Sequence, residues 1–122
     1  MKPLKVLVID NEDVICNACR LVLTEKGHDV DISKTGKSGL IAVGHTTYDL
    51  VLLDIKLPDM DGMDILKTVK ENLPTLHIIV MTGYATLSNA VQAMKLGAND
   101  YLSKPFTDDE LVAAVEKARE GL

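Results

Sequence analysis

Five short runs of apolar residues, rich in β-branched side chains, recur along the chain. We predict one strand in each of them: Leu4 to Asp10, His28 to Ser33, Tyr48 to Asp54, Leu76 to Met81, and Asn99 to Ser103. The first, third and fourth runs are nearly continuous, with few polar residues between the apolar ones. Strands of this kind are buried on both faces, as in a parallel sheet covered by helices on each side.

Between these runs, apolar residues recur at the three- and four-residue spacing of amphipathic helices. Four such stripes are clear: Ile15, Ala18, Cys19, Val22 and Leu23; Ile65, Leu66, Val69 and Leu73; Leu87, Ala90, Val91 and Met94; Leu111, Val112, Val115 and Ala118. Gly27, Pro74 and Gly97 are placed to end the first three helices. Thr107 and Glu110 form a capping box that begins the fourth.

Strands and helices therefore alternate five times. This alternation predicts an α/β fold, with a parallel sheet between two layers of helices. Right-handed crossovers and a reversal of the winding direction give a doubly wound, five-stranded sheet in the order 2-1-3-4-5. Residues 36–45 form the weakest helix pattern because they include three glycines, so we expect a short or mobile helix there.

Length and composition fit one globular domain. The 122 residues are 47% hydrophobic and 25% charged, which suffices for a core and argues against disorder. A net charge of −5 argues against a nucleic-acid-binding surface. No run approaches the roughly 20 apolar residues of a membrane span. The N-terminus also lacks a signal-peptide pattern, so we expect a cytoplasmic protein.

Cysteines and histidines do not indicate a redox or zinc site. Cys16 and Cys19 have the spacing of a redox pair, but such a pair opens a helix, whereas these residues lie inside one. We expect both to be small core residues, and two cysteines without nearby histidines do not supply four zinc ligands. His28, His45 and His77 are scattered, and we expect structural or solvent-facing roles for them.

Polar residues stand where four of the predicted strands end. In doubly wound folds, ligands bind beyond the carboxyl ends of the strands, where the winding reverses. Asp10 ends the first strand and Asp54 the third, while Thr82 and Lys104 follow the fourth and fifth. Two carboxylates 4 Å apart repel each other by about 4 kcal/mol at an effective dielectric constant of 20. Protonation, the Lys104 ammonium or a hard divalent cation would offset this repulsion.

Three segments at this end of the sheet resemble motifs of response-regulator receiver domains. Asp54 to Gly62 resembles their phosphoacceptor loop, Met81 to Ala85 their strand-four switch motif, and Gly97 to Phe106 their strand-five signature. The resemblance covers essentially the whole chain. It implies a flavodoxin-like three-layer sandwich in which residues 1–122 form a receiver domain, compatible with a piece cut from a longer protein. Ala90 to Ala98 is most similar to receivers of enhancer-binding transcription regulators.

The resemblance also implies roles for individual residues. Asp54 would accept a phosphoryl group from a sensor histidine kinase or a histidine phosphotransfer protein. Mg²⁺ would be held by Asp10, Asp54 and the backbone carbonyl of Lys56. Lys104 would pair with the phosphoryl group, and the Thr82 hydroxyl would move to bond it. No enzyme activity is implied beyond self-catalysed phosphoryl transfer and slow autodephosphorylation.

Receivers transmit the signal through the face formed by helix 4, strand 5 and helix 5. The resemblance implies that Tyr101 swings inward and changes this face, through which a homodimer can form. A plain core aromatic is the alternative for Tyr101. A cis Lys104–Pro105 bond is expected as well. Neither nucleic-acid binding by this domain nor membrane binding is implied.

Residue 11 departs from the family pattern. Strand one of most receivers ends in two adjacent acids, but here Asp10 is followed by Asn11, whose amide offers one neutral oxygen. In one interpretation Asn11 is a weaker metal ligand still in place, and in another Glu12 partly substitutes through water. In a third interpretation metal binding is weak, which favours a binding module that uses the same face without phosphorylation.

Two further functions share parts of the pattern. Haloacid-dehalogenase-type phosphatases also use an Asp after a strand, but they have a second Asp two residues later, where Lys56 stands here. Flavodoxin-like flavin binders have a hydroxyl-rich phosphate loop after strand one. The acidic stretch from Asp10 to Asp13 would repel a phosphate, so both functions are disfavoured.

Overall fold

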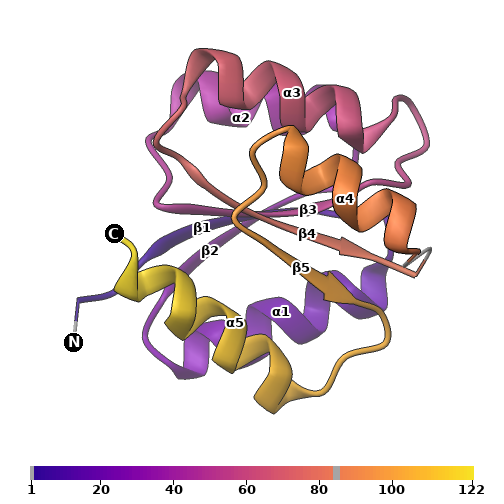
Figure 1. Cartoon of the computed structure of the whole chain (residues 1–122). Coiled ribbons are helices and arrows are strands. Elements are labelled where there is room, and N and C mark those ends of the chain that lie inside the picture. Colours follow the sequence, from indigo (N-terminus) through magenta and orange to yellow (C-terminus); the bar gives the residue numbers. More distant parts are fainter. Residues whose placement is uncertain (1, 84–85) are drawn as a thin grey trace.

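A computed structural model describes residues 2–83 and 86–122, in which five strands and five helices alternate (Figure 1). The strands are β1 (Lys5–Ile9), β2 (Asp29–Ser33), β3 (Leu50–Asp54), β4 (His77–Thr82) and β5 (Asp100–Ser103). The helices are α1 (Asp13–Glu25), α2 (Gly36–His45), α3 (Gly62–Asn72), α4 (Leu87–Lys95) and α5 (Asp108–Glu120). None of the described helices has the length and apolar character of a membrane span.

The five strands form one parallel sheet in the order β2-β1-β3-β4-β5, which confirms the predicted topology. Helices α1 and α5 cover one face, and α2, α3 and α4 cover the other (Figure 1). The winding reverses at β1, so β1 and β3 are neighbours although β2 separates them in the sequence. Their register pairs Ile9 with Leu53, which brings the residues after both strands to the same edge of the sheet.

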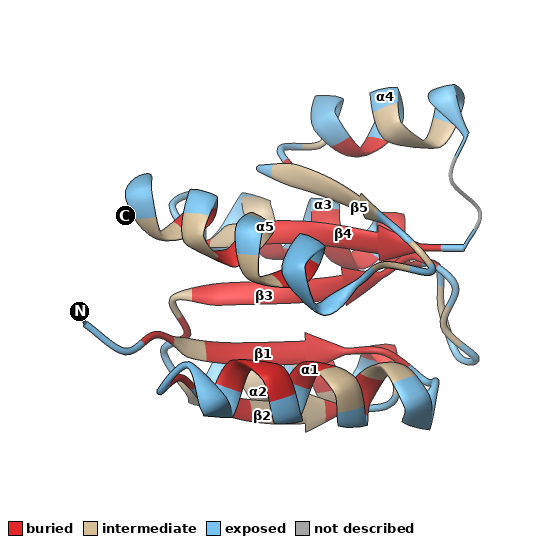
Figure 2. Ribbon diagram, turned by 90° about the horizontal axis from the view of Figure 1, so that it is seen from below, coloured by how far each residue is buried: buried red, intermediate tan, exposed pale blue. Residues whose placement is uncertain are grey.

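Two clusters of buried side chains hold the layers together. Val6 and Val8 pack with the apolar stripes of α1 and α5, whereas Leu7 and Ile9 pack on the opposite face, beneath α2, α3 and α4. Successive residues of β1 thus serve different cores, which explains its continuous apolar sequence. All of β3 is buried, while β5 is only partly covered (Figure 2).

Local signals at the helix ends are confirmed. The Thr107 hydroxyl accepts from the Glu110 backbone N–H at 3.1 Å, and the Glu110 side chain accepts from the Thr107 N–H at 3.0 Å. Gly27 and Gly97 have positive φ angles of 89° and 102°, a conformation that favours glycine after a helix.

Both cysteines are free and buried, as expected. Burial raises the pKa of the Cys19 thiol to about 12, which disfavours the thiolate that redox chemistry needs. The Lys104–Pro105 peptide bond is cis, also as expected.

Helix α2 corrects the part of the expectation that concerned its length. It has ten residues, one more than α4, and so is not short. Gly36 and Gly39 are buried in it, and a Cβ atom at Gly39 would lie 2.6 Å from Cδ1 of Ile9. The low helix propensity of glycine is therefore outweighed by the close packing that the missing side chains allow. Thr35 and Ser38 also form a capping box at its start.

Gly62, the first residue of α3, lies against the loop that follows β3. A Cβ atom there would lie 2.4 Å from Cα of Ile55 and 2.5 Å from the carbonyl oxygen of Asp54, so backbone atoms would have to move. We expect Gly62→Ala to lower the free energy of unfolding by more than about 2 kcal/mol in urea titrations. Gly44→Ala, with no atom within 4 Å, is the control and should be neutral or slightly stabilising. Equal effects of the two substitutions would contradict this packing argument.

His28 connects the start of β1 with α5. Its Nδ1 accepts from the Leu4 backbone N–H at 3.0 Å, and burial, aided by the Arg119 guanidinium, lowers its pKa. The His28 side chain therefore binds a proton at a higher pH in the unfolded chain than in the folded protein.

As a consequence, the free energy of unfolding should fall as the pH drops below about 6.5. His28→Gln should flatten this dependence, whereas His45→Gln, at an exposed position of α2, should retain it. Urea titrations at pH 7.5, 6.5 and 5.5 measure the effect. If the free energy of unfolding of His28→Gln depended on pH as steeply as that of the wild type, groups other than His28 would cause the dependence.

Candidate functional site

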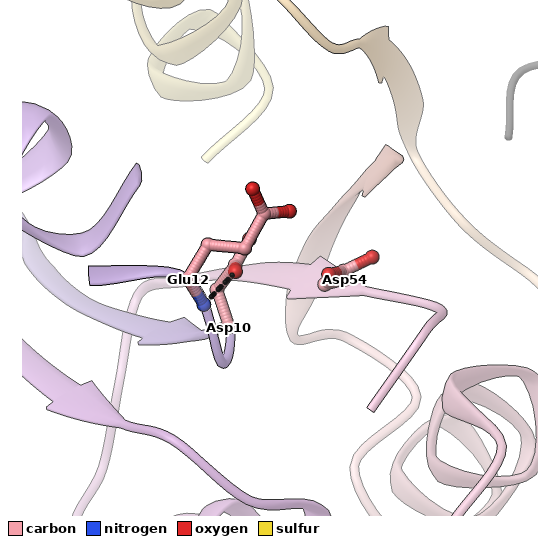
Figure 3. Close-up of side chains that lie close together, drawn as sticks. All are labelled: Asp10, Glu12 and Asp54. Carbon is pink, nitrogen blue, oxygen red and sulfur yellow. Dashed lines mark hydrogen bonds between the residues drawn. The ribbon is translucent and has the colours of Figure 1, made fainter. Parts of the chain in front are cut away.

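Two aspartates lie side by side where β1 and β3 end. Asp10 follows β1 and is completely buried, and Asp54, the last residue of β3, is 3% exposed (Figure 3). Carboxylates are rarely buried to this extent without a compensating partner because desolvation disfavours the charged form. The sheet register fixes both residues in this position.

Lys104 supplies the compensating positive charge. Its Nζ atom lies 2.7 Å from Oδ2 of Asp10, 2.8 Å from Oε1 of Glu12 and 3.1 Å from Oδ2 of Asp54. The Lys104 side chain is only 7% exposed. Burial by itself lowers the pKa of Lys104, but the ion pairs with the three carboxylates outweigh burial and raise it. The ammonium therefore stays charged throughout the physiological pH range.

The position of Lys104 follows from the end of β5. Its backbone N–H donates to the carbonyl oxygen of Thr82 at 2.9 Å, which continues the pairing of β5 with β4. Thr82 is fully buried at the end of β4, one position beyond the residue that pairs with Asp54. The carboxyl ends of β1, β3, β4 and β5 thus bring together the residues that the sequence singled out.

Asp10 is the most deeply buried acid of the site. Burial raises its pKa, although Lys104 and the Glu12 backbone N–H, which donates to Oδ1 at 2.8 Å, act in the opposite direction. Its Oδ2 forms the ion pair with Lys104 but accepts no well-directed hydrogen bond within the described residues. This oxygen can therefore accept a further ligand, such as a cation.

The side chains fit a hard divalent cation. Asp10, Glu12 and Asp54 each offer a carboxylate oxygen, and these three atoms lie within 4.8 Å of one another. One ammonium balances only one of the three negative charges. Oxygen ligands with surplus negative charge are what Mg²⁺ and Ca²⁺ prefer. The backbone N–H of Lys56 donates to Oδ1 of Asp54 at 3.1 Å, which places the Lys56 backbone beside the same carboxylate.

The loop between β3 and α3 carries two more acids, both with structural roles. Asp59 accepts from the backbone N–H groups of Lys37 and Gly36 at the start of α2, and these bonds lower its pKa. Asp61 accepts from the N–H of Met63 at 2.9 Å and so caps α3. These contacts anchor the loop on which Lys56 lies.

Two predicted residues, Tyr101 and Asn11, lie in other surroundings. Tyr101 packs its ring against the core beneath α2, α3 and α4, and its buried hydroxyl has no hydrogen-bond partner in the described part of the chain. Asn11 is exposed. Tyr84 and Ala85, the last residues of the predicted switch motif, lie outside the described residues.

Glu12 is the residue whose place the sequence left open. Its carboxylate contacts Lys104 directly, whereas the next acid, Asp13, pairs with Lys34. After β1 ends, side chains no longer alternate between the two faces of the sheet. The sequence therefore did not determine whether Glu12 or Asp13 turns toward the site.

Known proteins resemble this chain over most of its length. A family model described as response regulator receiver domain matches residues 6–116. The transcriptional regulatory protein ZraR of Escherichia coli (strain K12) is 37% identical over 113 residues, or 93% of this chain and 26% of ZraR. The luminescence regulatory protein LuxO of Vibrio campbellii is 42% identical over 99 residues, or 81% of this chain and 22% of LuxO. The chain thus spans about a quarter of the length of these relatives.

The fold has close structural neighbours. The crystal structure of a response regulator receiver domain protein (CheY-like) from Methanospirillum hungatei JF-1 matches with a TM-score of 0.92 and 32% sequence identity. The match covers 98% of this chain and 96% of that chain.

The raised pKa of Asp10 has a consequence for stability. At pH 7 this carboxylate is charged at a position that favours the neutral form, so Asp10→Asn should raise the free energy of unfolding on the order of 1 kcal/mol. The gain should shrink toward pH 4, because the folded wild-type protein then takes up a proton at Asp10 before the unfolded chain does. Urea titrations at pH 7 and pH 4.5 measure this, with Asp13→Asn as the exposed control. A destabilised Asp10→Asn protein at pH 7 would contradict the argument.

Proposed function

The chain belongs to the response regulator receiver domain family, and from this premise we propose that it accepts a phosphoryl group on Asp54 in an Mg²⁺-dependent reaction. The main support is the arrangement of Asp54 itself. Its carboxylate is buried beside a second acid and lies 3.1 Å from a lysine ammonium. A carboxylate oxygen, a group of acids that suits a cation and a fixed positive charge thus lie together at one end of the sheet.

The proposed reaction is transfer from a phosphohistidine. A carboxylate oxygen of Asp54 attacks phosphorus, the phosphorus–nitrogen bond breaks, and the imidazole of the donor leaves with that electron pair. Phosphoryl transfer depends on alignment and charge neutralisation more than on covalent help from the protein. Lys104 is placed for neutralisation because its ammonium already lies at the Asp54 carboxylate.

Asp10, Asp54 and the backbone carbonyl of Lys56 would hold Mg²⁺, and Asn11 or Glu12 would complete the protein ligands. The bound ion supplies positive charge that neutralises the phosphoryl oxygens. The surplus of carboxylates over ammonium groups supports this ligand set, as does the bond that fixes Lys56 against Asp54.

We expect the signal to pass from Asp54 to the face formed by α4, β5 and α5. Thr82 would move its hydroxyl toward the phosphoryl group. Tyr101 would then move into the space beside Thr82. The Tyr101 hydroxyl is already buried in this structure and has no hydrogen-bond partner among the described residues, so the movement would change the packing of this side chain within the core. On α4, Leu87, Val91 and Met94 are exposed with helical spacing, which supports a homodimer through this face.

The proposed partners are a sensor histidine kinase or a histidine phosphotransfer protein, in the cytoplasm. The acidic net charge of −5 argues against nucleic-acid binding by this domain. Some of its relatives are transcriptional regulatory proteins, so in a longer protein this domain would control a transcriptional output. The domain itself would act as a switch whose only chemistry is its own phosphorylation and slow dephosphorylation.

One observation favours a second function. Residue 11 is an exposed amide where the family pattern has an acid, which would suit a binding module that works without phosphorylation. Such a module would keep the face of α4, β5 and α5 but would not need a cation.

Incubation with acetyl phosphate separates these functions. In the presence of Mg²⁺, intact-mass spectrometry should show a mass gain of one phosphoryl group. The gain should be absent with EDTA and in Asp54→Ala, and it should be retained in Asp64→Asn, an exposed acid on α3. An unmodified wild-type protein, or a gain that persists in folded Asp54→Ala, would overturn the proposal.

A further inference from the structure

We propose that Glu12 supplies the carboxylate that residue 11 lacks, so that the cation site is formed by Asp10, Glu12 and Asp54, with Asn11 outside it. This inference rests on the proposed function, because it concerns the cation that phosphoryl transfer to Asp54 would use.

The geometry places Glu12 in the site. Its Oε1 atom contacts the same ammonium that contacts both buried aspartates, at 2.8 Å. Its backbone N–H donates to Oδ1 of Asp10, so the turn after β1 is tied to the first acid of the site. Figure 3 shows the Glu12 side chain extending from this turn to the Asp10 and Asp54 carboxylates.

A second observation points to a ligand. Oδ2 of Asp10 is fully buried and turned toward this cluster, where its partner among residues 2–83 and 86–122 is the Lys104 ammonium at 2.7 Å, without a hydrogen bond of good geometry. A buried carboxylate oxygen usually accepts hydrogen bonds or binds a metal. Three carboxylates share this one ammonium, so accepting capacity remains where they converge.

Glu12 determines whether the net charge of the site matches a divalent cation. With Glu12, three carboxylates and one ammonium leave two negative charges, which match a divalent cation. If Glu12 is left out, the site of Asp10, Asp54 and Lys104 has a net charge of only one negative unit. The neutral amide of Asn11 does not supply the missing negative charge. The substitution of an acid by an amide at residue 11 is thus balanced by an acid one position later.

Glu12 is also free to change partners. Its side chain is 60% exposed, so its ion pair with Lys104 contributes little to stability. Lys104 would keep its contacts with Asp10 and Asp54 if the Glu12 carboxylate turned to a cation. Asp13, the neighbouring acid, pairs with Lys34 outside the site, so it is a control of equal charge and nearly equal position.

The test is a titration with Mg²⁺ alone, without a phosphodonor, followed by backbone amide shifts in NMR spectra. Glu12→Gln should weaken Mg²⁺ binding by roughly tenfold because one of the three charges is removed. Asp13→Asn should change the affinity less than about twofold, since a solvent-exposed charge outside the site is largely screened. Asn11→Asp added to Glu12→Gln should restore much of the Mg²⁺ affinity that Glu12→Gln loses. Made in the wild-type protein, where Glu12 is present, Asn11→Asp should strengthen Mg²⁺ binding by a smaller factor.

The outcomes distinguish this inference from the proposed function. Equal Mg²⁺ affinities of wild type and Glu12→Gln, with binding abolished in Asp10→Asn, would overturn the role of Glu12 and leave phosphorylation of Asp54 intact. Equal losses in Glu12→Gln and Asp13→Asn would also overturn it, because they would indicate a general effect of net charge. Absence of Mg²⁺ binding in the wild type would overturn both.

Discussion

Repulsion between two buried carboxylates is the constraint around which this end of the molecule is organised. The pairing of β1 with β3 fixes Asp10 and Asp54 beside each other, and the cores on both faces of the sheet prevent either strand from moving away. At a separation of about 4 Å such a pair costs about 4 kcal/mol at an effective dielectric constant of 20. The Lys104 ammonium offsets part of this cost, and a cation would offset the part that remains.

The sequence predicted the sheet and its order because the strands are apolar runs that alternate with helix patterns, four of which are clear. It also predicted which residues meet, since in a parallel sheet the residues after neighbouring strands lie at the same edge. Asp10, Asp54 and Lys104 were found on this ground alone, and the contacts of Lys104 agree with it. The resemblance to receiver domains added roles for these residues.

Two features could not be read from the sequence, for separate physical reasons. The length of α2 depends on tertiary packing, because Gly39 lies against Ile9, and local propensity does not include this contact. The direction of Glu12 depends on the turn after β1, where neither the two-residue period of a strand nor the helical period applies. Only the structure shows that this side chain joins the site while Asp13 turns to Lys34.

Strand β5 connects this site to the least protected part of the sheet. Its residues are half-buried or exposed, whereas β3, which carries Asp54, is buried along its whole length. Local opening needs less free energy where fewer apolar contacts are broken. Lys104 directly follows β5 and contacts Asp54. A change of charge at Asp54 would therefore act on a strand whose displacement needs little free energy. The sheet thus has a gradient of mechanical stiffness, in which the Asp54 carboxylate sits at the stiff end and its counter-ion, Lys104, at the compliant edge.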